Sequence, residues 1–247
     1  MTTKGDMMSK SLKVVLGTLL CMMAISTSGC IGIFDGNGVV QTTTRSIPAN
    51  GIEQVTADFD MGAGDLMIRG GPTGIMDGTF RYTNDDWDPE ISYDSEGKSA
   101  SLNVKNQINI SLRSNRVNEW DVSLGHGIVY DLSASLGAGD VMIDVSELAL
   151  SGLHVSVGAG NIELDMSGDY TNDFNAYIDI DVGDASITLP STVGVEVITD
   201  TDVGNVTAHG LIAYGNVYRN EAYGKSPITI TIEIDGDVAD ILLSVEE

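Results

Sequence analysis

A short phrase recurs along the chain and constrains its fold more than any other feature. It consists of an apolar residue, a Gly-Ala-Gly turn and then Asp or Asn, and it occurs at Met61–Asp65, Leu136–Asp140 and Val157–Asn161. Shortened forms follow at Val182–Asp184 and Val203–Asn205. Glycine reaches backbone angles that residues with a Cβ adopt only at a cost, so each copy predicts a sharp corner.

The segments on both sides of these corners alternate apolar and polar residues. Val55, Ala57 and Phe59 lead into the first corner, and Leu66 and Ile68 follow it. Such alternation is typical of strands with one buried face. No window shows a convincing helical stripe, so the sequence predicts an all-β fold.

The spacing of the corners indicates how the strands are arranged. Gly158 follows Gly137 by 21 residues, Gly183 follows Gly158 by 25, and Gly204 follows Gly183 by 21. A step in the twenties with two strands per step predicts a single-domain β-solenoid, whose successive coils stack and bury their apolar rows. A β-sandwich is the alternative, because the same glycine phrase could close antiparallel hairpins.

Residues 1–29 have the composition of a signal peptide. Lys4, Lys10 and Lys13 give a positive start, and the apolar run Val14–Ile25 follows. This run is short for a membrane span, which needs about 20 residues. We therefore predict a secretory leader over residues 1–29, with an uncleaved N-terminal anchor as the alternative.

Small residues at positions 26–29 lead directly to Cys30. This pattern resembles the prokaryotic lipobox, which implies that Cys30 is lipidated and becomes the mature N-terminus. The protein is then an extracytoplasmic lipoprotein anchored to the cell membrane, although plain secretion would also explain the leader. The Gly- and Thr-rich residues 30–50 predict a flexible tether, and residues 51–247 predict the β-solenoid repeat domain.

The charge balance is strongly acidic. The formal net charge is −24, and it becomes −26 without residues 1–29, which hold three Lys and one Asp. Between Val117 and Tyr218 there are sixteen Asp and Glu and no Lys or Arg. Such a surface repels nucleic acid and anionic lipid headgroups. It acts either as a cation-attracting face or as a solvated coat that keeps the protein soluble.

Residues with catalytic or metal-binding spacing are not found in the sequence. His126, His154 and His209 have no second histidine at ligand spacing, and no nucleophile-elbow motif occurs. His154 falls on the polar side of its strand, so we expect it to face solvent. We predict no catalytic residue, no metal site and no cofactor.

Calcium binding at the corners is the sharpest hypothesis about chemistry. Calcium takes six to eight oxygen ligands, and stacked corners would align the side chains that follow the glycines. In the alternative, these side chains hydrogen-bond the local backbone and hold each corner. The residues are Asp65, Asp140, Asn161, Asp184 and Asn205.

The two tryptophans, Trp87 and Trp120, have two interpretations. Aromatic residues dominate binding hot spots, so either could anchor a partner. Burial at the ends of the solenoid or under a loop is the alternative.

Several segments resemble the toast-rack family of prokaryotic envelope proteins. They are Tyr130–Asp140, Asp144–Leu153, Val157–Asn161 and Ile187–Val195, within a similarity that spans about Ile52–Leu211. The chain is also similar to β-repeat domains of candidate adhesins and of cell-wall-antibiotic-response regulators. The resemblance implies a β-solenoid, often attached to the membrane, mostly without an assigned activity.

Together these features predict a non-catalytic, lipid-anchored cell-envelope protein that presents an acidic surface as an adhesin-like or scaffold module. Its partners would be the membrane, through the lipid, and an envelope protein or cell-surface polymer; no oligomeric state is predicted. One alternative is an envelope-stress sensor acting through a membrane partner. Another is a calcium-stabilised β-helix that binds carbohydrate or acts on polysaccharide.

Overall fold

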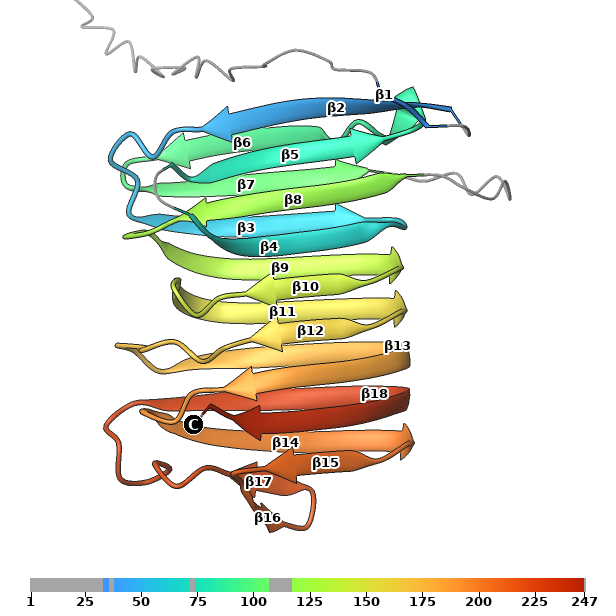
Figure 1. Ribbon diagram of the computed structural model, residues 1–247. Coiled ribbons are helices and arrows are strands. Elements are labelled where there is room, and N and C mark those ends of the chain that lie inside the picture. Colours follow the sequence, from blue (N-terminus) through green and yellow to red (C-terminus); the bar gives the residue numbers. More distant parts are fainter. Residues whose placement is uncertain (1–32, 36–37, 72–73, 107–116, 247) are drawn as a thin grey trace, which may run out of the picture.

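The computed structural model in Figure 1 describes residues 33–35, 38–71, 74–106 and 117–246. The predicted signal peptide, Cys30 and the predicted strand residues Ile108–Leu112 lie outside the described residues. Within the described ranges, no helix has the length and apolar character needed to cross a membrane.

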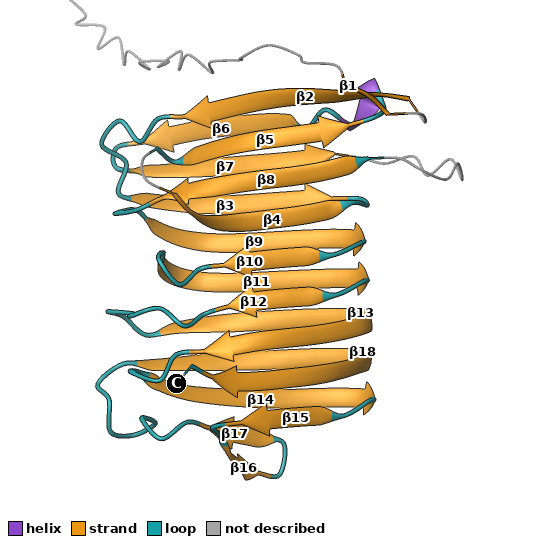
Figure 2. Ribbon diagram, in the orientation of Figure 1, coloured by secondary structure: helices purple, strands orange, loops and turns teal. Residues whose placement is uncertain are grey.

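Strands make up nearly all of the regular structure, as Figure 2 shows, so the predicted all-β fold is confirmed. The described residues also hold one short 3-10 helix, η1 (Asp85–Trp87). The strands are β1 (Ile33–Asp35), β2 (Gly38–Ile47), β3 (Gln54–Met61), β4 (Asp65–Gly71), β5 (Met76–Tyr82), β6 (Glu90–Glu96), β7 (Ser99–Asn106), β8 (Asn118–Gly125), β9 (Val129–Ala138), β10 (Val141–Asp144), β11 (Ala149–Ala159), β12 (Ile162–Asp165), β13 (Phe174–Leu189), β14 (Gly194–Val203), β15 (Val206–His209), β16 (Ile212–Tyr214), β17 (Val217–Arg219) and β18 (Thr229–Val245).

Most of these strands belong to two parallel ladders that are joined at the corners. The entry ladder holds the strands that lead into a corner, in the order β7, β3, β9, β11, first half of β13, first half of β18, β14. The exit ladder holds the strands that leave it, in the order β8, β4, β10, β12, second half of β13, second half of β18, β15. One entry strand and its exit strand form a rung.

The order of the rungs differs from the order of the sequence (Figure 1). β18, from the C-terminal end, lies between the rung of β13 and the rung of β14 and β15. The prediction that successive corners stack is therefore confirmed from Gly139 to Gly183 and is wrong at Gly204, which lies against Ala239 of β18. Corner spacing could not reveal this insertion, because a strand added from elsewhere leaves the spacing unchanged.

Alternate residues of the two ladders fill one hydrophobic interior. On β11, Leu153, Val155 and Val157 are buried. On β12, Ile162 and Leu164 are buried and alternate with the polar residues of the same strand. Burying one such aliphatic side chain contributes about 1.5–3 kcal/mol. The interior is a single continuous cluster along the stack, which is the main source of stability that the fold shows.

Antiparallel strands close the two ends of the stack. β6 pairs with β7, and β5 pairs with both β2 and β8 at one end. At the other end the β16–β17 hairpin pairs with β14. The glycine corners themselves join parallel ladders and do not close hairpins, so the sandwich alternative is wrong for the body of the stack.

The ordered region begins earlier than the sequence suggested. Gly38–Ile47 forms β2 and pairs with β5, so this part of the predicted tether (residues 30–50) is wrong. Its threonines favour strands because they are β-branched, and Val40 and Ile47 are buried. β8 was also not predicted, although Trp120 and Val122 alternate with polar residues along it.

Tyr130 of β9 forms hydrogen bonds with β8 and with the residue that precedes β5, near one end of the stack. Its side chain is fully buried, and its hydroxyl donates to the carbonyl oxygen of Ile75 at 2.9 Å and accepts from the backbone N–H of Gly125 at 3.1 Å. Burial raises the pKa of Tyr130 above its ordinary value. The hydroxyl therefore stays neutral and keeps its proton for this bond.

We predict that Tyr130→Phe lowers the free energy of unfolding by about 1–3 kcal/mol, because it leaves two buried backbone groups without a partner. Urea denaturation measures this change. Tyr214→Phe is the control, since Tyr214 is 59% exposed and its loss of a hydroxyl should have almost no effect. Equal changes in the two variants would contradict the prediction.

Candidate functional site: the corner ladder and its groove

The corner of each rung lies directly against the corner of the next. Gly139, Gly160 and Gly183 have φ angles of 132°, 148° and 152°. A Cβ on Gly160 would lie 1.6 Å from the carbonyl oxygen of Gly139, and a Cβ on Gly183 would lie 1.6 Å from that of Gly160. These positions exclude every residue with a side chain, both by conformation and by contact.

Backbone hydrogen bonds hold the stacked corners together. The N–H of Gly139 donates to the carbonyl of Ala159 at 2.8 Å, and the N–H of Gly160 donates to that of Val182 at 2.9 Å. Neighbouring rungs thus remain hydrogen-bonded through the turn, and these backbone N–H groups do not depend on water for a partner.

The polar residues that follow the corner glycines form a single file with Glu119 of β8 and Asp240 of β18, which occupy the same register position, and we call this file the corner ladder. Asp140 Oδ1 accepts from the backbone N–H of Asn161 at 3.1 Å and from Asn161 Nδ2 at 2.9 Å. Asn161 Oδ1 in turn accepts from the backbone N–H of Asp184 at 3.3 Å. The order along the stack is Glu119, Asp65, Asp140, Asn161, Asp184, Asp240, Asn205.

The same arrangement recurs near the other end of the ladder. Asp240 Oδ1 accepts from the backbone N–H of Asn205 at 2.9 Å and from Asn205 Nδ2 at 3.2 Å. The sequence predicted that such side chains bond the local backbone of their own corner. The structure shows that they bond the next rung, so they fasten neighbouring rungs to one another.

The corner ladder does not gather its oxygens around one point. Among the described residues, no group of three or more His, Cys, Asp or Glu side chains is placed to hold a metal ion. Calcium needs six to eight oxygens, whereas the corner ladder presents its side chains one rung at a time. The stacking of corners that the calcium hypothesis required is present. The Oδ1 atoms of Asp140, Asn161 and Asp240 accept hydrogen bonds from the next rung.

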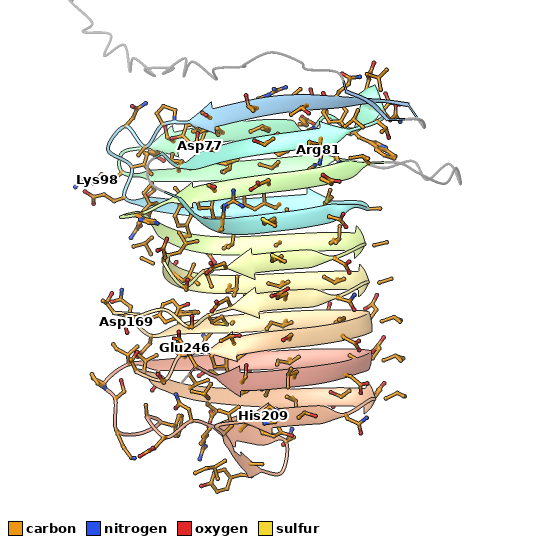
Figure 3. The ribbon with its side chains drawn as sticks, viewed as in Figure 1. Asp77, Arg81, Lys98, Asp169, His209 and Glu246 are labelled. Carbon is orange, nitrogen blue, oxygen red and sulfur yellow. The ribbon has the colours of Figure 1, made fainter. Side chains whose placement is uncertain are left out.

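A groove of about 1620 Å³ runs beside the corner ladder on the outer face of the exit ladder. We call it the corner groove. The corner ladder forms one wall, and the floor is formed by the side chains two residues further along each strand. Along the stack these are Asp121, Met67, Met142, Glu163, Ser186, Leu242 and Thr207. Figure 3 labels Arg81, which lines the groove at its β5 end.

A second, smaller hollow of about 410 Å³ lies on the outer face of the entry ladder. The rings of His154 and Tyr177 line it and stack, with their centres 5.2 Å apart and their planes at 13°. Gly152, next to a register shift between β9 and β11, also lines it. Partial burial raises the pKa of Tyr177, and Asp179 raises it further. His154 lies on the outer face, as predicted, while nothing in the sequence marked Tyr177 as its partner.

The other residues singled out in the sequence are scattered. His126 lies 3.2 Å from Glu147 in an exposed pair, and His209 is exposed on β15 (Figure 3). Trp87 and Trp120 are 5% and 1% exposed, so the burial interpretation is confirmed and neither is free to anchor a partner. The structure does not bring these residues together.

One surface cluster, half-buried except for the exposed Tyr214, was missed altogether. The guanidinium of Arg219 lies 4.4 Å from the ring centre of Tyr223 and 5.6 Å from that of Tyr214, and it pairs with Glu196. Glu196 reaches Arg219 through the pairing of β17 with β14, and this contact left no local sequence pattern. Tyr214 and Tyr223 lie within five residues of Arg219 in the sequence.

Residues 36–188 match the family model described as the N-terminal domain of toast_rack, DUF2154. This match spans more than half of the chain, so the chain belongs to the toast-rack family, as the resemblance implied. The matched region begins before the predicted start at Ile52 and includes β2. It ends near the end of β13, before the rung of β14 and β15.

The solved structure of a candidate cell adhesion protein from Clostridium sporogenes is similar to this chain, with 33% identity and a TM-score of 0.80. The similarity covers 84% of this chain and 100% of that one. A candidate adhesin from Bacteroides fragilis matches at 12% identity and a TM-score of 0.29, covering 82% of this chain and 96% of that one. No curated protein matches the sequence.

We predict that Gly160→Ala prevents the stack from closing, because the new Cβ would overlap the carbonyl oxygen of Gly139. The loss of stability should exceed about 3 kcal/mol, well above the roughly 1–2 kcal/mol cost of positive φ alone. Gly215→Ala isolates that second cost, since Gly215 has φ +69° with nothing within 4 Å. Thermal melting of both variants checks the prediction, and similar melting temperatures would refute it.

We further predict that Asn161→Asp destabilises the protein by about 0.5–1.5 kcal/mol, because the Nδ2 donor is lost and a carboxylate is placed beside those of Asp140 and Asp184. High salt should reduce the effect by screening the exposed charges. Asn172→Asp, in an exposed loop, is the control with the same charge change. Urea denaturation at low and high salt measures both variants, and a loss independent of salt would count against charge repulsion.

Proposed function

We propose that this protein is a lipid-anchored cell-envelope module that acts by presenting its surface, as an adhesin-like or scaffold protein without catalysis. The observation that carries the proposal is the similarity to the candidate cell adhesion protein of Clostridium sporogenes, over the whole of that chain. Identity of 33% with a TM-score of 0.80 supports a shared use of the fold, beyond a shared architecture.

The two ladders support the finer description of the domain as a short β-solenoid. Each rung contributes one entry and one exit strand, and a rung alone could not bury its apolar row. Such a stack is rigid and has long outer faces whose side chains repeat at the strand spacing. These are properties that suit a display surface.

The positions of the carboxylates support an acidic display surface. On the outer face of the entry ladder, Asp179, Asp235 and Asp200 occupy one register position on three adjacent strands. Asp200 and Asp235 are exposed, and Asp179 is half-buried. Since residues Val117–Tyr218 hold no Lys or Arg, nothing basic from this part of the chain offsets them.

The position of Cys30 in the sequence suggests how the stack would stand on a membrane. Cys30 precedes β1 by three residues, and β1 pairs with β2 at one end of the stack. A lipid on Cys30 would hold this end near the bilayer and leave the β16–β17 end farthest from it. The corner groove would then run away from the membrane.

We predict that Cys30→Ser moves the protein from the membrane fraction to the soluble extracytoplasmic fraction. Cys21→Ser is the matched control, because Cys21 lies inside the predicted leader and should leave anchoring unchanged. In a deletion strain, the wild-type chain and Cys21→Ser should restore adherence of cells to a surface, and Cys30→Ser should not.

Two results would overturn the proposal. Retention of Cys30→Ser on the membrane would refute the lipid anchor. Unchanged adherence of the deletion strain, together with an altered envelope-stress reporter, would refute the adhesin-like role in favour of a regulatory one.

A further inference from the structure

We propose that the corner groove binds an extended, lysine-rich polypeptide segment of a partner protein. The inference rests on the proposed display role, because it names the partner chemistry that such a surface would take. It is carried by the shape of the groove, the charge of its wall and the apolar side chains of its floor.

The groove has the dimensions of an extended peptide. It passes over every rung from β8 to β15, and these six steps span about 29 Å at about 4.8 Å per strand. An extended chain rises about 3.3 Å per residue, so the groove accommodates roughly nine residues. Every rung from β8 to β15 contributes lining residues, and the groove has a volume of about 1620 Å³.

The wall of the groove is anionic and held in place. Asp140 and Asp240 are exposed, and each uses Oδ1 to accept a hydrogen bond from the next rung, which holds its carboxylate in place. Asp65 and Asp184 are exposed members of the same file. Ammonium groups that follow the groove would therefore meet carboxylates on most rungs, two of them held in place, and charge-assisted hydrogen bonds are stronger than neutral ones.

The floor provides apolar contacts between the charges. Met67 and Met142 are register partners on β4 and β10, and Met142 and Leu242 are 43% and 39% exposed. Lysine stems bury their methylene groups on such surfaces while the ammonium group reaches the carboxylates. The flexible methionine side chains can adapt their shape to these lysine stems. The floor therefore suits a peptide with long alkyl side chains better than a peptide with short polar ones.

The lining also argues against a sugar chain. Saccharide rings pack well on exposed aromatic faces, but Trp120 is the sole aromatic residue among those that line the groove, and it is 1% exposed. Nucleic acid would be repelled by the acidic wall. At the β5 end, Arg81 pairs with Glu119 and neutralises the first carboxylate of the corner ladder. The part of the groove from Asp65 to Asp240 would therefore receive the cations.

The test measures binding of a fluorescein-labelled ten-residue peptide of alternating Lys and Ser by anisotropy, with the purified full chain in mild detergent. The groove variant carries Asp65→Asn, Asp184→Asn and Asp240→Asn. The matched control carries Asp179→Asn, Asp200→Asn and Asp235→Asn on the outer face of the entry ladder, so both variants lose the same charge. Thermal melting verifies that both are folded.

We expect the groove variant to weaken binding by about tenfold or more, because it removes three carboxylates from the wall of the groove. The control should weaken binding by less than about twofold. A tenfold change in affinity corresponds to about 1.4 kcal/mol. Met142→Ser should also weaken binding, which a purely electrostatic attraction would not explain. A peptide with acetylated lysines should not bind.

The inference is overturned if the peptide does not bind, if both triple variants weaken binding equally, or if the acetylated peptide binds as well. Spermine competing at the same concentration as the peptide would show a site for small polyamines and would overturn the assignment to a polypeptide. Because the assay uses no cells, its failure is distinguishable from a failure of the adherence experiment.

Discussion

Backbone contact between stacked corners is the constraint on which the rest of the structure depends. At Gly139, Gly160 and Gly183 the carbonyl of one rung occupies the space where a side chain of the next would begin. This contact sets the spacing of the rungs and keeps entry and exit strands in register on both ladders. The continuous interior follows, because every apolar row then lies directly on the row of the next rung.

The same contact places one polar residue per rung in single file. Two unit charges about 4 Å apart in water repel by about 1 kcal/mol, so an uninterrupted file of carboxylates would oppose stacking. Asn161 and Asn205 relieve this by donating to Asp140 and Asp240. The corner ladder therefore stabilises the stack while it keeps an anionic wall beside the corner groove.

Local patterns predicted the corners, the strands around them and the single file of polar side chains, since each depends on residues that are close in sequence. They did not predict that β18 inserts between β13 and β14, because parallel pairing across 35 or more residues leaves no local signal. The stacking of His154 on Tyr177 and the pairing of Arg219 with Glu196 were also missed, because each joins residues 23 positions apart on two different strands. The corner groove was also not predicted, since it is a property of many rungs together.

Disulfide trapping tests the stacking order most directly. Thr188 of β13 is the register partner of Ser244 of β18, and Ser244 is also the partner of His209 of β15. In a chain whose Cys21 and Cys30 are replaced by serine, the pair Thr188→Cys with Ser244→Cys should cross-link readily, because adjacent strands lie within disulfide reach. The pair Thr188→Cys with His209→Cys should not. Efficient cross-linking of the second pair and not the first would show that the coils stack in sequence order and would contradict this account.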